Sequence, residues 1–596
     1  MCGIVGYAGH REALPLLLDS LRRLEYRGYD SAGVAVIDDG GVVLHKDKGF
    51  IAALEPGMPR SRGVTGLAHT RWATHGRPSK ENAHPFVDCT GDLALAHNGI
   101  IENFMQLRDQ LKAEGHRFTS ETDTETAVHL LEKHYRGDLR LAMREALKEI
   151  RGTYAFVAVH RSEPGRVVAA RNESPLVIGL GNDENFVASD VTALLKHTTK
   201  VAYVMDGEVV TITPDEVRIE NGSGEAILRE PQRITWTIDD AERGGFDHFM
   251  LKEIYEQPKA LHETLLGRAL ESELNGLLAG VRSVKLVAMG TSFHAALAGK
   301  YLLEKIGRIP ATAELASEYR YSAHPGDKPL VVLLSQSGET ADTLGAAREA
   351  RRRGCRTVAV TNVVGSSITR EVDASVFTRA GIEIGVAATK TFLTQLALLY
   401  LLAIQLGRQS GAVAPEEERR LLEGLRSAPR AVHAVLSDAD LIREVAERYA
   451  KATTMFVIGR GSEFPMALEG ALKIKEISYI HAEAYAAGEL KHGPLALLTA
   501  ETPVVAIAVR DALYERTLSN IGEAAARDAP ILAIGTAGDR ELTKRADDVL
   551  WVPEVDEVFY PFPVAVTLQL LAYHLARARG CSIDKPRNLA KSVTVE

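Results

Sequence analysis

The chain has 596 residues, too many for one hydrophobic core, and this length predicts three or four domains. Its 70 Lys and Arg against 79 Asp and Glu give a net charge of −9 without any prominent basic run, which does not favour nucleic-acid binding. The four cysteines, Cys2, Cys89, Cys355 and Cys581, lie far apart and form no CxxC pair. That spacing argues against a zinc site or a disulfide framework and favours a reducing cytoplasm.

The hydrophobic pattern predicts neither a signal peptide nor a membrane span. The N-terminus lacks a basic region followed by an apolar run. The longest apolar stretch, residues 396–404, is far shorter than the roughly 20 residues needed to cross a bilayer. We therefore expect a soluble cytoplasmic protein without a membrane partner.

Residues 1–236 have short alternating segments broken by Gly and Asp turns. Helices are expected near residues 11–24 and 123–135, and buried strands at 34–37, 93–96 and 154–159. This pattern predicts stacked antiparallel sheets with helices. The polar stretch at 237–245 (TIDDAERGG) is typical of a linker.

After residue 245 the pattern changes to alternating strands and helices, and an internal repeat appears. Residues 284–290 (VKLVAMG) match residues 454–459 (TMFVIG) at an offset of about 170. Residues 330–334 match 503–507, Val376 matches Val549 and Tyr400 matches Tyr573 at nearly the same offset. We expect two copies of one doubly wound α/β domain. The expected boundaries are 237–277 for a linker and lead-in helix, 278–412 and 445–580 for the two copies, and 581–596 for a C-terminal tail.

Cys2 is the first candidate catalytic residue. Removal of Met1 would leave a thiol and a free α-amine on the same residue, and such an amine has a pKa of roughly 7.7–8.0. It can activate the sulfur directly or through one water. The alternative is a buried hydrophobic cysteine on a first strand.

Three later clusters supply what attack on a side-chain amide requires. Arg71 offers a bidentate partner for an α-carboxylate, and Asp123 a counter-charge for an α-ammonium. The Asn98 side chain and the Gly99 N–H can hold a developing oxyanion. Separately, these residues have simpler explanations as an ion pair, a helix cap and a turn. With Cys2 they form a complete glutamine-hydrolysing set.

Four segments carry a resemblance: residues 1–6 (MCGIVG), 26–33 (YRGYDSAG), 69–76 (HTRWATHG) and 97–103 (HNGIIEN). They resemble the glutaminase domain of the glutamine–fructose-6-phosphate aminotransferase family, also called glucosamine-6-phosphate synthases, which has an N-terminal nucleophile fold. The resemblance implies an amidotransferase domain at 1–236 with Trp72 as an ammonia gate. It also implies a glutamine site formed by Arg71, Thr74, His75 and Asp123. Phe86 departs from the family, which usually has a second histidine there.

Residues 335–340 (SQSGET) lie between a predicted strand and a helix in the first repeat. Hydroxyl and N–H groups at such a junction favour an anion, although serine is also a common N-cap. The second copy has Val-Arg-Asp at 509–511 and lacks these hydroxyls. GxxxxGK[ST] is absent, and residues 459–464 fail the dinucleotide pattern. We expect phosphate at the first copy only, held by Ser335, Gln336, Ser337 and Thr340.

Glu469, Lys473 and Glu476 share one face of a helix expected at 467–477. A solvated ion-pair ladder is the ordinary outcome of such spacing. A histidine, His492, follows in a loop bounded by Gly and Pro, and Lys591 lies in a terminal segment whose composition is typical of a fraying tail.

The repeat, residues 488–494 (GELKHGP) and residues 585–596 (KPRNLAKSVTVE) resemble the tandem sugar isomerase (SIS) domains of the same family. The resemblance implies His492 as the acid/base of ring opening, Lys591 as the Schiff-base lysine and Glu476 as the proton shuttle, tuned by Lys473. It also implies that Ser292, Val386 and Ala388 contact the sugar phosphate. Ala388 stands where the family has serine, so its contact would be through backbone.

Taken together, the resemblance implies an α+β N-terminal nucleophile (class II amidotransferase) sandwich followed by two SIS domains of doubly wound, mostly parallel sheet. The implied reaction makes glucosamine 6-phosphate and glutamate from L-glutamine and fructose 6-phosphate, the first step toward UDP-N-acetylglucosamine. No cofactor and no metal are expected. The resemblance implies a homodimer formed through the isomerase half. It also implies an enzyme of the bacterial type, because the chain lacks the extra glutaminase segment of animal and fungal relatives.

Three alternatives remain open at this point. An amidotransferase acting on another keto-sugar phosphate is the nearest. A glutaminase coupled to phosphoribosyl transfer would need a pyrophosphate loop and an acidic metal pair after residue 245, and neither is found. A sugar-phosphate sensor would have a DNA-binding domain and no need for Cys2.

Overall fold

The computed structural model describes residues 2–72, 76–234, 242–267, 270, 274, 276–322 and 328–593. Internal contacts divide the chain into two compact units. The first comprises Met1–Ala241 together with the terminal Ala590–Glu596, and the second comprises Glu242–Leu589.

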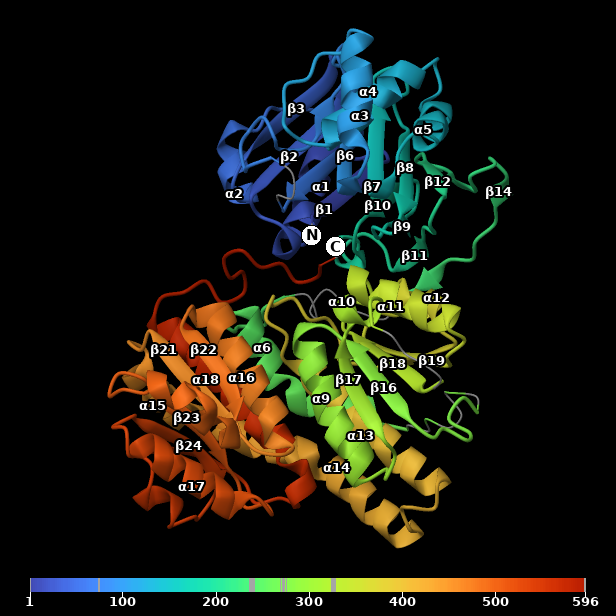
Figure 1. Cartoon of the computed structure of the whole chain (residues 1–596). Coiled ribbons are helices and arrows are strands. Elements are labelled where there is room, and N and C mark those ends of the chain that lie inside the picture. Colours follow the sequence, from blue (N-terminus) through green and yellow to red (C-terminus); the bar gives the residue numbers. More distant parts are fainter. Residues whose placement is uncertain are drawn as a thin grey trace. The chain divides into compact units, whose positions relative to one another are not determined.

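Two stacked antiparallel sheets form the first unit within its described residues (Figure 1). The first sheet has the order β15-β11-β9-β10-β1-β4-β2-β3, with bounds Gln232–Arg233, Lys200–Tyr203, Val177–Leu180, Asn185–Ala188, Gly3–Ala8, Thr65–Arg71, Ser31–Asp38 and Gly41–Lys48. The second has the order β14-β13-β12-β8-β7-β6-β5, with bounds Ala226–Ile227, Val217–Glu220, Val209–Ile212, Val167–Asn172, Gly152–His160, Leu93–Ile101 and Phe86–Val87.

Helices cover the outer faces of both sheets. α1 (Ala13–Arg22) and α2 (Ile51–Leu54) pack on the first sheet, while α3 (Phe104–Ala113), α4 (Thr124–His134) and α5 (Leu139–Leu147) belong to the second. Strand residues are apolar on both sides because one side meets the other sheet and the other side meets helices. Ile4, for example, enters the core between the sheets, whereas Val5 packs toward α1. The predicted sandwich is confirmed, and α1 and α4 lie where helices were expected.

Two parallel five-stranded sheets form the second unit within its described residues (Figure 1). The first has the order β17-β16-β18-β19-β20, with bounds Ala311–Leu315, Val284–Ala288, Leu330–Ser335, Thr357–Thr361 and Ala374–Phe377. The second has the order β22-β21-β23-β24-β25, with bounds His481–Ala486, Thr454–Gly459, Val504–Ala508, Ile531–Thr536 and Asp548–Val552. The identical strand orders match the repeat in the sequence, and the predicted doubly wound fold is confirmed.

Equivalent helices of the two copies share one continuous core. α9 (Gly290–Lys305) and α16 (Glu463–Ser478) follow the first strand of each copy and pack against each other. The long helices α13 (Lys390–Gln409) and α18 (Pro561–Ala578) lie in the same core. Within the described residues, the other α-helices of this unit are α6 (Phe249–Tyr255), α7 (Gln257–Leu265), α10 (Ala316–Tyr319), α11 (Ala341–Arg352), α12 (Ile368–Glu371), α14 (Pro415–Ser437), α15 (Ala439–Tyr449) and α17 (Tyr514–Ala525).

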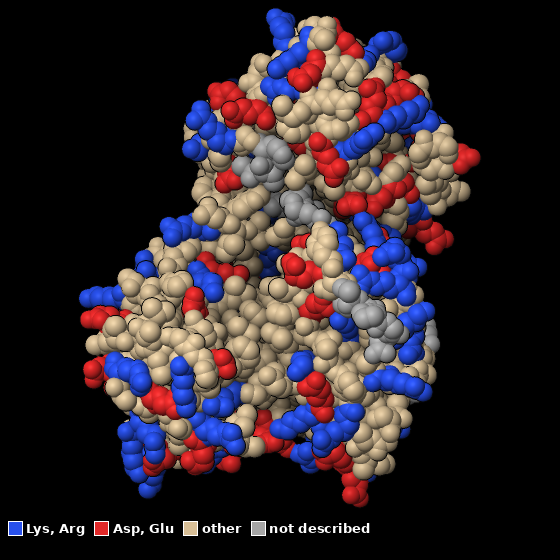
Figure 2. All heavy atoms as spheres, in the orientation of Figure 1, with Lys and Arg blue, Asp and Glu red and all other residues tan. Residues whose placement is uncertain are grey.

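Two segments, Lys390–Gln409 and Glu557–Ala578, are long and apolar enough to cross a membrane. Their most apolar windows are 89% and 100% buried inside the structure, as in core helices of globular domains. On the face shown in Figure 2, basic and acidic side chains are intermixed over both units.

A buried carboxyl at the start of α16 makes stability depend on pH. Burial, with the Asp511 charge next, raises the pKa of Glu463 to about 8. An unfolded glutamate has a pKa of roughly 4.3, so the folded state holds this proton more tightly and loses stability as pH rises from about 4.3 to about 8.

We therefore expect Glu463→Gln to raise the melting temperature at pH 8.5 by several degrees, while leaving it unchanged near pH 4.5, where the native side chain is already neutral. Thermal unfolding at both pH values measures this. Glu515→Gln, in the first turn of α17 at an exposed position, is the matched control. An equal shift at both pH values would contradict the assignment.

Candidate functional site

Cys2 lies at the head of β1, beside the end of β4. Its Sγ accepts a hydrogen bond from the Trp72 N–H (3.1 Å) and donates to the Trp72 carbonyl oxygen (3.4 Å). Burial raises the pKa of the thiol, while the N-terminal amine, Trp72 and Arg71 act in the opposite direction. The sulfur is thus held at the end of the sheet, and its ionisation depends on positive groups beside it.

Asn98, on β6 of the second sheet, is oriented by a neutral histidine. His69 Nε2 lies 3.1 Å from both the His97 carbonyl oxygen and Asn98 Oδ1. Burial lowers the pKa of His69 to about 3, so the ring is neutral, and Nε2 carries the proton because both its partners are acceptors. This bond directs the other end of the amide to Cys2, where Asn98 Nδ2 donates to the carbonyl oxygen of Cys2 (3.0 Å).

The next residue must be glycine. Gly99 has a φ of +128°, and a Cβ at this position would lie 2.1 Å from the Thr153 carbonyl oxygen. The ladder between β6 and β7 (Gly99 opposite Tyr154) therefore requires a residue without a side chain. The His-Asn-Gly motif is part of a strand here and not the turn that would be its ordinary form.

Arg71 and Asp123 are buried beside Cys2. Burial lowers the pKa of the Arg71 guanidinium, and the charges of Cys2, Asp123 and Asp30 oppose that shift. Asp123 precedes α4, yet its side chain does not cap that helix; Oδ2 instead accepts the Ile101 N–H (2.9 Å). The structure thus brings Arg71 and Asn98 next to Cys2, with Asp123 close to Arg71 and Gly99 following Asn98 on β6.

The other predicted residues of this site have mixed outcomes. Thr74 and His75 lie outside the described residues. The Trp72 ring meets the edge of Tyr29 at a centroid distance of 5.9 Å. Phe86, the departure from the family pattern, packs edge-on against His84 and lies under the Lys46 ammonium (4.2 Å).

The predicted anion loop, residues 335–340, lies in the first sheet of the second unit, next to the point where the strand order reverses. β16 pairs with β17 on one side and with β18 on the other, so the chain crosses from one side of β16 to the other between β17 and β18. In sheets of this kind, ligands bind at the carboxyl ends of the strands at this position. The Ser335 hydroxyl there accepts the Gly338 N–H and contacts Thr340 Oγ1, both at 3.1 Å. Ser337 Oγ accepts the Glu339 N–H (3.2 Å). Gln336 and Ser337 are half-buried, and so is Ser292 in the first turn of α9.

Carboxylates fix the loop at residues 383–389. Glu253, from α6, accepts the N–H groups of Ile384 and Gly385 (2.5 and 3.1 Å). Glu383 accepts the N–H groups of Thr389 and Thr391 (both 3.0 Å). The predicted sugar-phosphate contacts at Val386 and, through backbone, at Ala388 therefore belong to a loop of defined shape.

The start of the tail is attached beside the same loop. The Asp584 carboxylate caps α6 by accepting the Phe249 and Met250 N–H groups (2.9 and 3.0 Å), and its carbonyl accepts the Val386 N–H (3.2 Å). Arg587 then lies over the Tyr479 ring (4.2 Å). Lys591 is half-buried and belongs to the terminal stretch that is part of the first unit.

The predicted carboxylate and lysine positions of α16 form a buried network. Lys473 Nζ lies 2.6 Å from Glu476 Oε2 and 3.5 Å from Glu469 Oε1, with Lys473 only 1% exposed. Burial disfavours the ammonium, but the two carboxylates outweigh this effect and raise the pKa of Lys473. The solvated ladder is therefore not what forms.

Glu469 also joins the two α/β copies. Its Oε1 accepts the Thr291 hydroxyl (3.1 Å), and its Oε2 lies 2.8 Å from His294 Nδ1, both from α9. By contrast, His492 ends the 3₁₀ helix Ala487–His492 and is exposed.

Comparison with known proteins identifies the domains that carry the Cys2 cluster and the loop at Ser335. The SIS domain family matches residues 277–405 and 448–579, and the glutamine amidotransferase domain family matches residues 69–196. Glutamine–fructose-6-phosphate aminotransferases (isomerizing) of Thermus thermophilus, Methanosarcina acetivorans and Aquifex aeolicus are 51%, 50% and 48% identical, with all of this chain and all of each relative covered. The chain belongs to this aminotransferase family.

A solved structure agrees with this membership. The C-terminal domain of glucosamine-fructose-6-phosphate aminotransferase from Francisella tularensis is 37% identical to this chain, with a TM-score of 0.55. It covers 58% of this chain and 99% of its own.

Sequence reasoning missed several residues of these sites in this aminotransferase. His69 is the first residue of the 69–76 motif, but nothing in its spacing indicated that it orients Asn98. His294 and Glu253 carried no signal, because each acts on a residue far along the chain. The burial of Glu253 and its role are apparent only once α6 is placed against the 383–389 loop.

Proposed function

We propose that this chain makes glucosamine 6-phosphate and glutamate from fructose 6-phosphate and L-glutamine, the reaction of the family to which it belongs, EC 2.6.1.16. Full-length identity of about half to aminotransferases of that name carries the proposal. The cluster around Cys2 and the hydroxyl loop at Ser335 support it, since they fit an amide and a phosphate respectively.

In the first half-reaction the Cys2 thiolate attacks the side-chain amide carbon of glutamine. Arg71 and Asp123, with Thr74 and His75, hold the amino-acid end, and Asn98 and Gly99 stabilise the oxyanion. The C–N bond breaks with proton transfer to nitrogen, and ammonia leaves a thioester that water hydrolyses to glutamate. The α-amine of Cys2 is the base once Met1 is removed.

In the second half-reaction His492 opens the sugar ring, and Lys591 forms a Schiff base at C2 with release of water. Ammonia displaces the lysine, giving an imine at C2. Glu476, tuned by Lys473, moves a proton from C1 to C2 through an enolamine. The proton of the C1 hydroxyl passes to the imine nitrogen, which leaves an aldehyde at C1 and an amino group at C2. Ser292, Ser335, Gln336, Ser337, Thr340, Val386 and Ala388 hold the sugar phosphate. The reaction requires no cofactor, because substrates supply both the phosphate and the nitrogen.

Ammonia must pass between the two reactions without reaching bulk water, where it would be protonated and lost. We assign the gate to Trp72, and a lid function over the sugar to the tail at 581–596. The lid also excludes water from the imine. We further propose a cytoplasmic homodimer formed through the SIS half, which light scattering would detect as twice the 64.7-kDa chain mass.

The deciding experiment is mass-spectrometric identification of the product from L-glutamine and fructose 6-phosphate. We expect glucosamine 6-phosphate carrying the amide nitrogen of glutamine labelled with ¹⁵N. A product formed only from another ketose phosphate would replace the proposed substrate while keeping the amidotransferase class.

Borohydride reduction with bound fructose 6-phosphate tests the Schiff-base lysine. We expect the sugar to be trapped on Lys591, and Lys591→Arg to abolish sugar turnover, because a guanidinium stays protonated and forms no imine. Glutamine hydrolysis should continue in that variant. Peptide mapping identifies the labelled residue, and a label on a different lysine would remove this assignment.

A further inference from the structure

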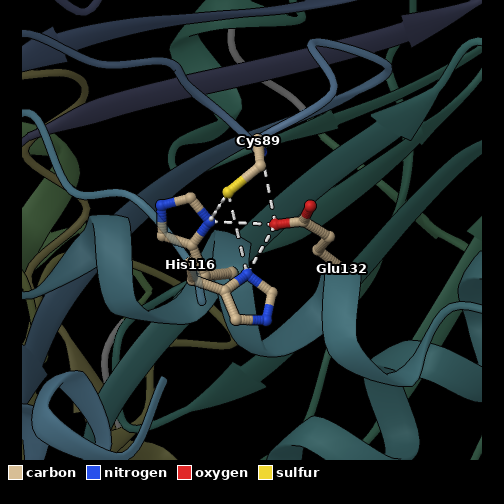
Figure 3. A group of neighbouring side chains, drawn as sticks. Cys89, His116 and Glu132 are labelled. Atoms are coloured by element: carbon tan, nitrogen blue, oxygen red, sulfur yellow. Dashed lines mark hydrogen bonds and ion pairs between the residues drawn. The ribbon is translucent and has the colours of Figure 1, made fainter. Parts of the chain in front are cut away.

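Four potential metal ligands meet on the first unit, in a region that the glutamine chemistry does not use. Cys89 follows β5, His116 follows α3, and His129 and Glu132 share one face of α4 (Figure 3). One ligand atom from each residue lies within 4.8 Å of the ligand atoms of the other three. The absence of a CxxC pair therefore did not exclude a metal site, because the ligands come from three separate segments.

The distances between these atoms match a small tetrahedral ion. Cys89 Sγ lies 3.8 Å from His116 Nδ1 and 3.6 Å from His129 Nδ1. Zinc bonds of roughly 2.3 Å to sulfur and 2.0–2.1 Å to nitrogen place such atoms roughly 3.6 Å apart at tetrahedral angles. Glu132 Oε2 lies 2.9 and 3.0 Å from the Nδ1 atoms of His116 and His129. To reach a tetrahedral position on the ion, this oxygen needs to move away from the two nitrogens by roughly half an ångström.

Surrounding contacts orient the ligands. The Arg117 N–H donates to Cys89 Sγ (3.4 Å), and the Cys89 N–H donates to Glu132 Oε2 (3.2 Å). The His129 ring packs edge-on against Phe118 at 4.6 Å and is almost fully buried. Support of this kind holds ligand side chains in one conformation, as metal sites require.

We propose that Cys89, His116, His129 and Glu132 bind one Zn²⁺ ion. A thiolate with two imidazoles and one carboxylate is a donor set typical of zinc, whereas Mg²⁺ and Ca²⁺ prefer oxygen alone. Four protein ligands complete a tetrahedron, so the ion has a structural role and activates no water.

The ion would join the turn after β5 to the end of α3 and to α4. α4 begins directly after Asp123, the residue assigned to the ammonium of glutamine. Zinc at this position therefore stabilises the segment on which the glutamine site depends, without touching the substrate.

Metal analysis of the full-length protein, purified without a histidine tag, tests the proposal. We expect about one zinc per chain in the native protein after dialysis, and less than about 0.1 per chain in Cys89→Ser and in His116→Gln. His116 is only partly buried, so its substitution should not disturb folding. Cys581→Ser, which alters a cysteine of similar exposure in the second unit, should keep its zinc. Zinc retained in both ligand variants, or absent from native protein incubated with Zn²⁺, would overturn the site.

Cobalt substitution gives a second readout that does not depend on enzyme activity. Co²⁺ in the native protein should produce thiolate-to-cobalt charge-transfer absorption and the intense visible bands of a tetrahedral ion. Both should disappear in Cys89→Ser and persist in Cys2→Ala, which excludes the catalytic thiol as the ligand. Charge-transfer absorption that follows Cys2 and not Cys89 would contradict the assignment.

Discussion

Replacing Cys2 with alanine is expected to lower glutamine-dependent formation of glucosamine 6-phosphate by at least about 10³-fold, because sulfur is the only atom of the site that can form the thioester. Alanine is also small, so Met1 removal is preserved. With ammonium at high pH as nitrogen source, the variant should still make product, since the sugar site lies on other residues. Product formation with each nitrogen source is the measurement.

Cys581→Ser is the control for loss of a partly buried thiol. Its glutamine-dependent rate should equal that of the native protein. Loss of the ammonium reaction together with the glutamine reaction in Cys2→Ala would contradict two separable half-reactions. Intact-mass analysis gives an independent check, since a fully active protein that retains Met1 would rule out the α-amine of Cys2 as the base.

Lys473→Met is expected to impair both stability and sugar turnover. The substitution keeps an unbranched stem but leaves Glu469 and Glu476 without their shared cation. Removing one partner of a buried ion pair costs about 3–5 kcal/mol, and mistuning the proton shuttle should slow the ammonium-dependent reaction by at least about 10²-fold. Thermal unfolding and steady-state rates with ammonium measure the two effects.

The double variant Lys473→Met/Glu469→Gln separates these effects. Neutralising Glu469 removes the buried charge, so most of the lost stability should return, while sugar turnover should stay low because Glu476 still lacks its lysine. Glutamine hydrolysis reports whether the first unit is folded, and far-UV circular dichroism reports whether the second unit, which carries the substitutions, is folded. A single variant with native stability and native turnover would show that the network is incidental.

Much of the architecture was predictable because its signals are local in the sequence. Strand periodicity at 93–96 and 154–159 predicted β6 and β7, and the offset between Val376 and Val549 predicted two sheets of one topology. The hydroxyl loop at Ser335 was identified by its position between a strand and a helix. Such patterns survive without tertiary information because each element must bury its own apolar face.

Several ordinary explanations could be rejected only in three dimensions. Asp123 occupies a helix N-cap position, yet its carboxylate bonds to Ile101 on a strand. The Glu469–Lys473–Glu476 spacing is the same in a solvated ladder and in a buried network, and only packing of α16 against α9 decides between them. Helical spacing defines a face but not what covers that face.

By itself, the sequence determined the class of reaction and the repeated α/β halves, and it predicted the nucleophile at Cys2, because motifs and periodicity depend on neighbours along the chain. The tertiary structure alone decided that His69 orients Asn98, that His294 meets Glu469, and that Cys89 lies beside His116, His129 and Glu132. Each of these contacts joins segments far apart in sequence, and their meeting depends on how sheets and helices pack rather than on any local pattern.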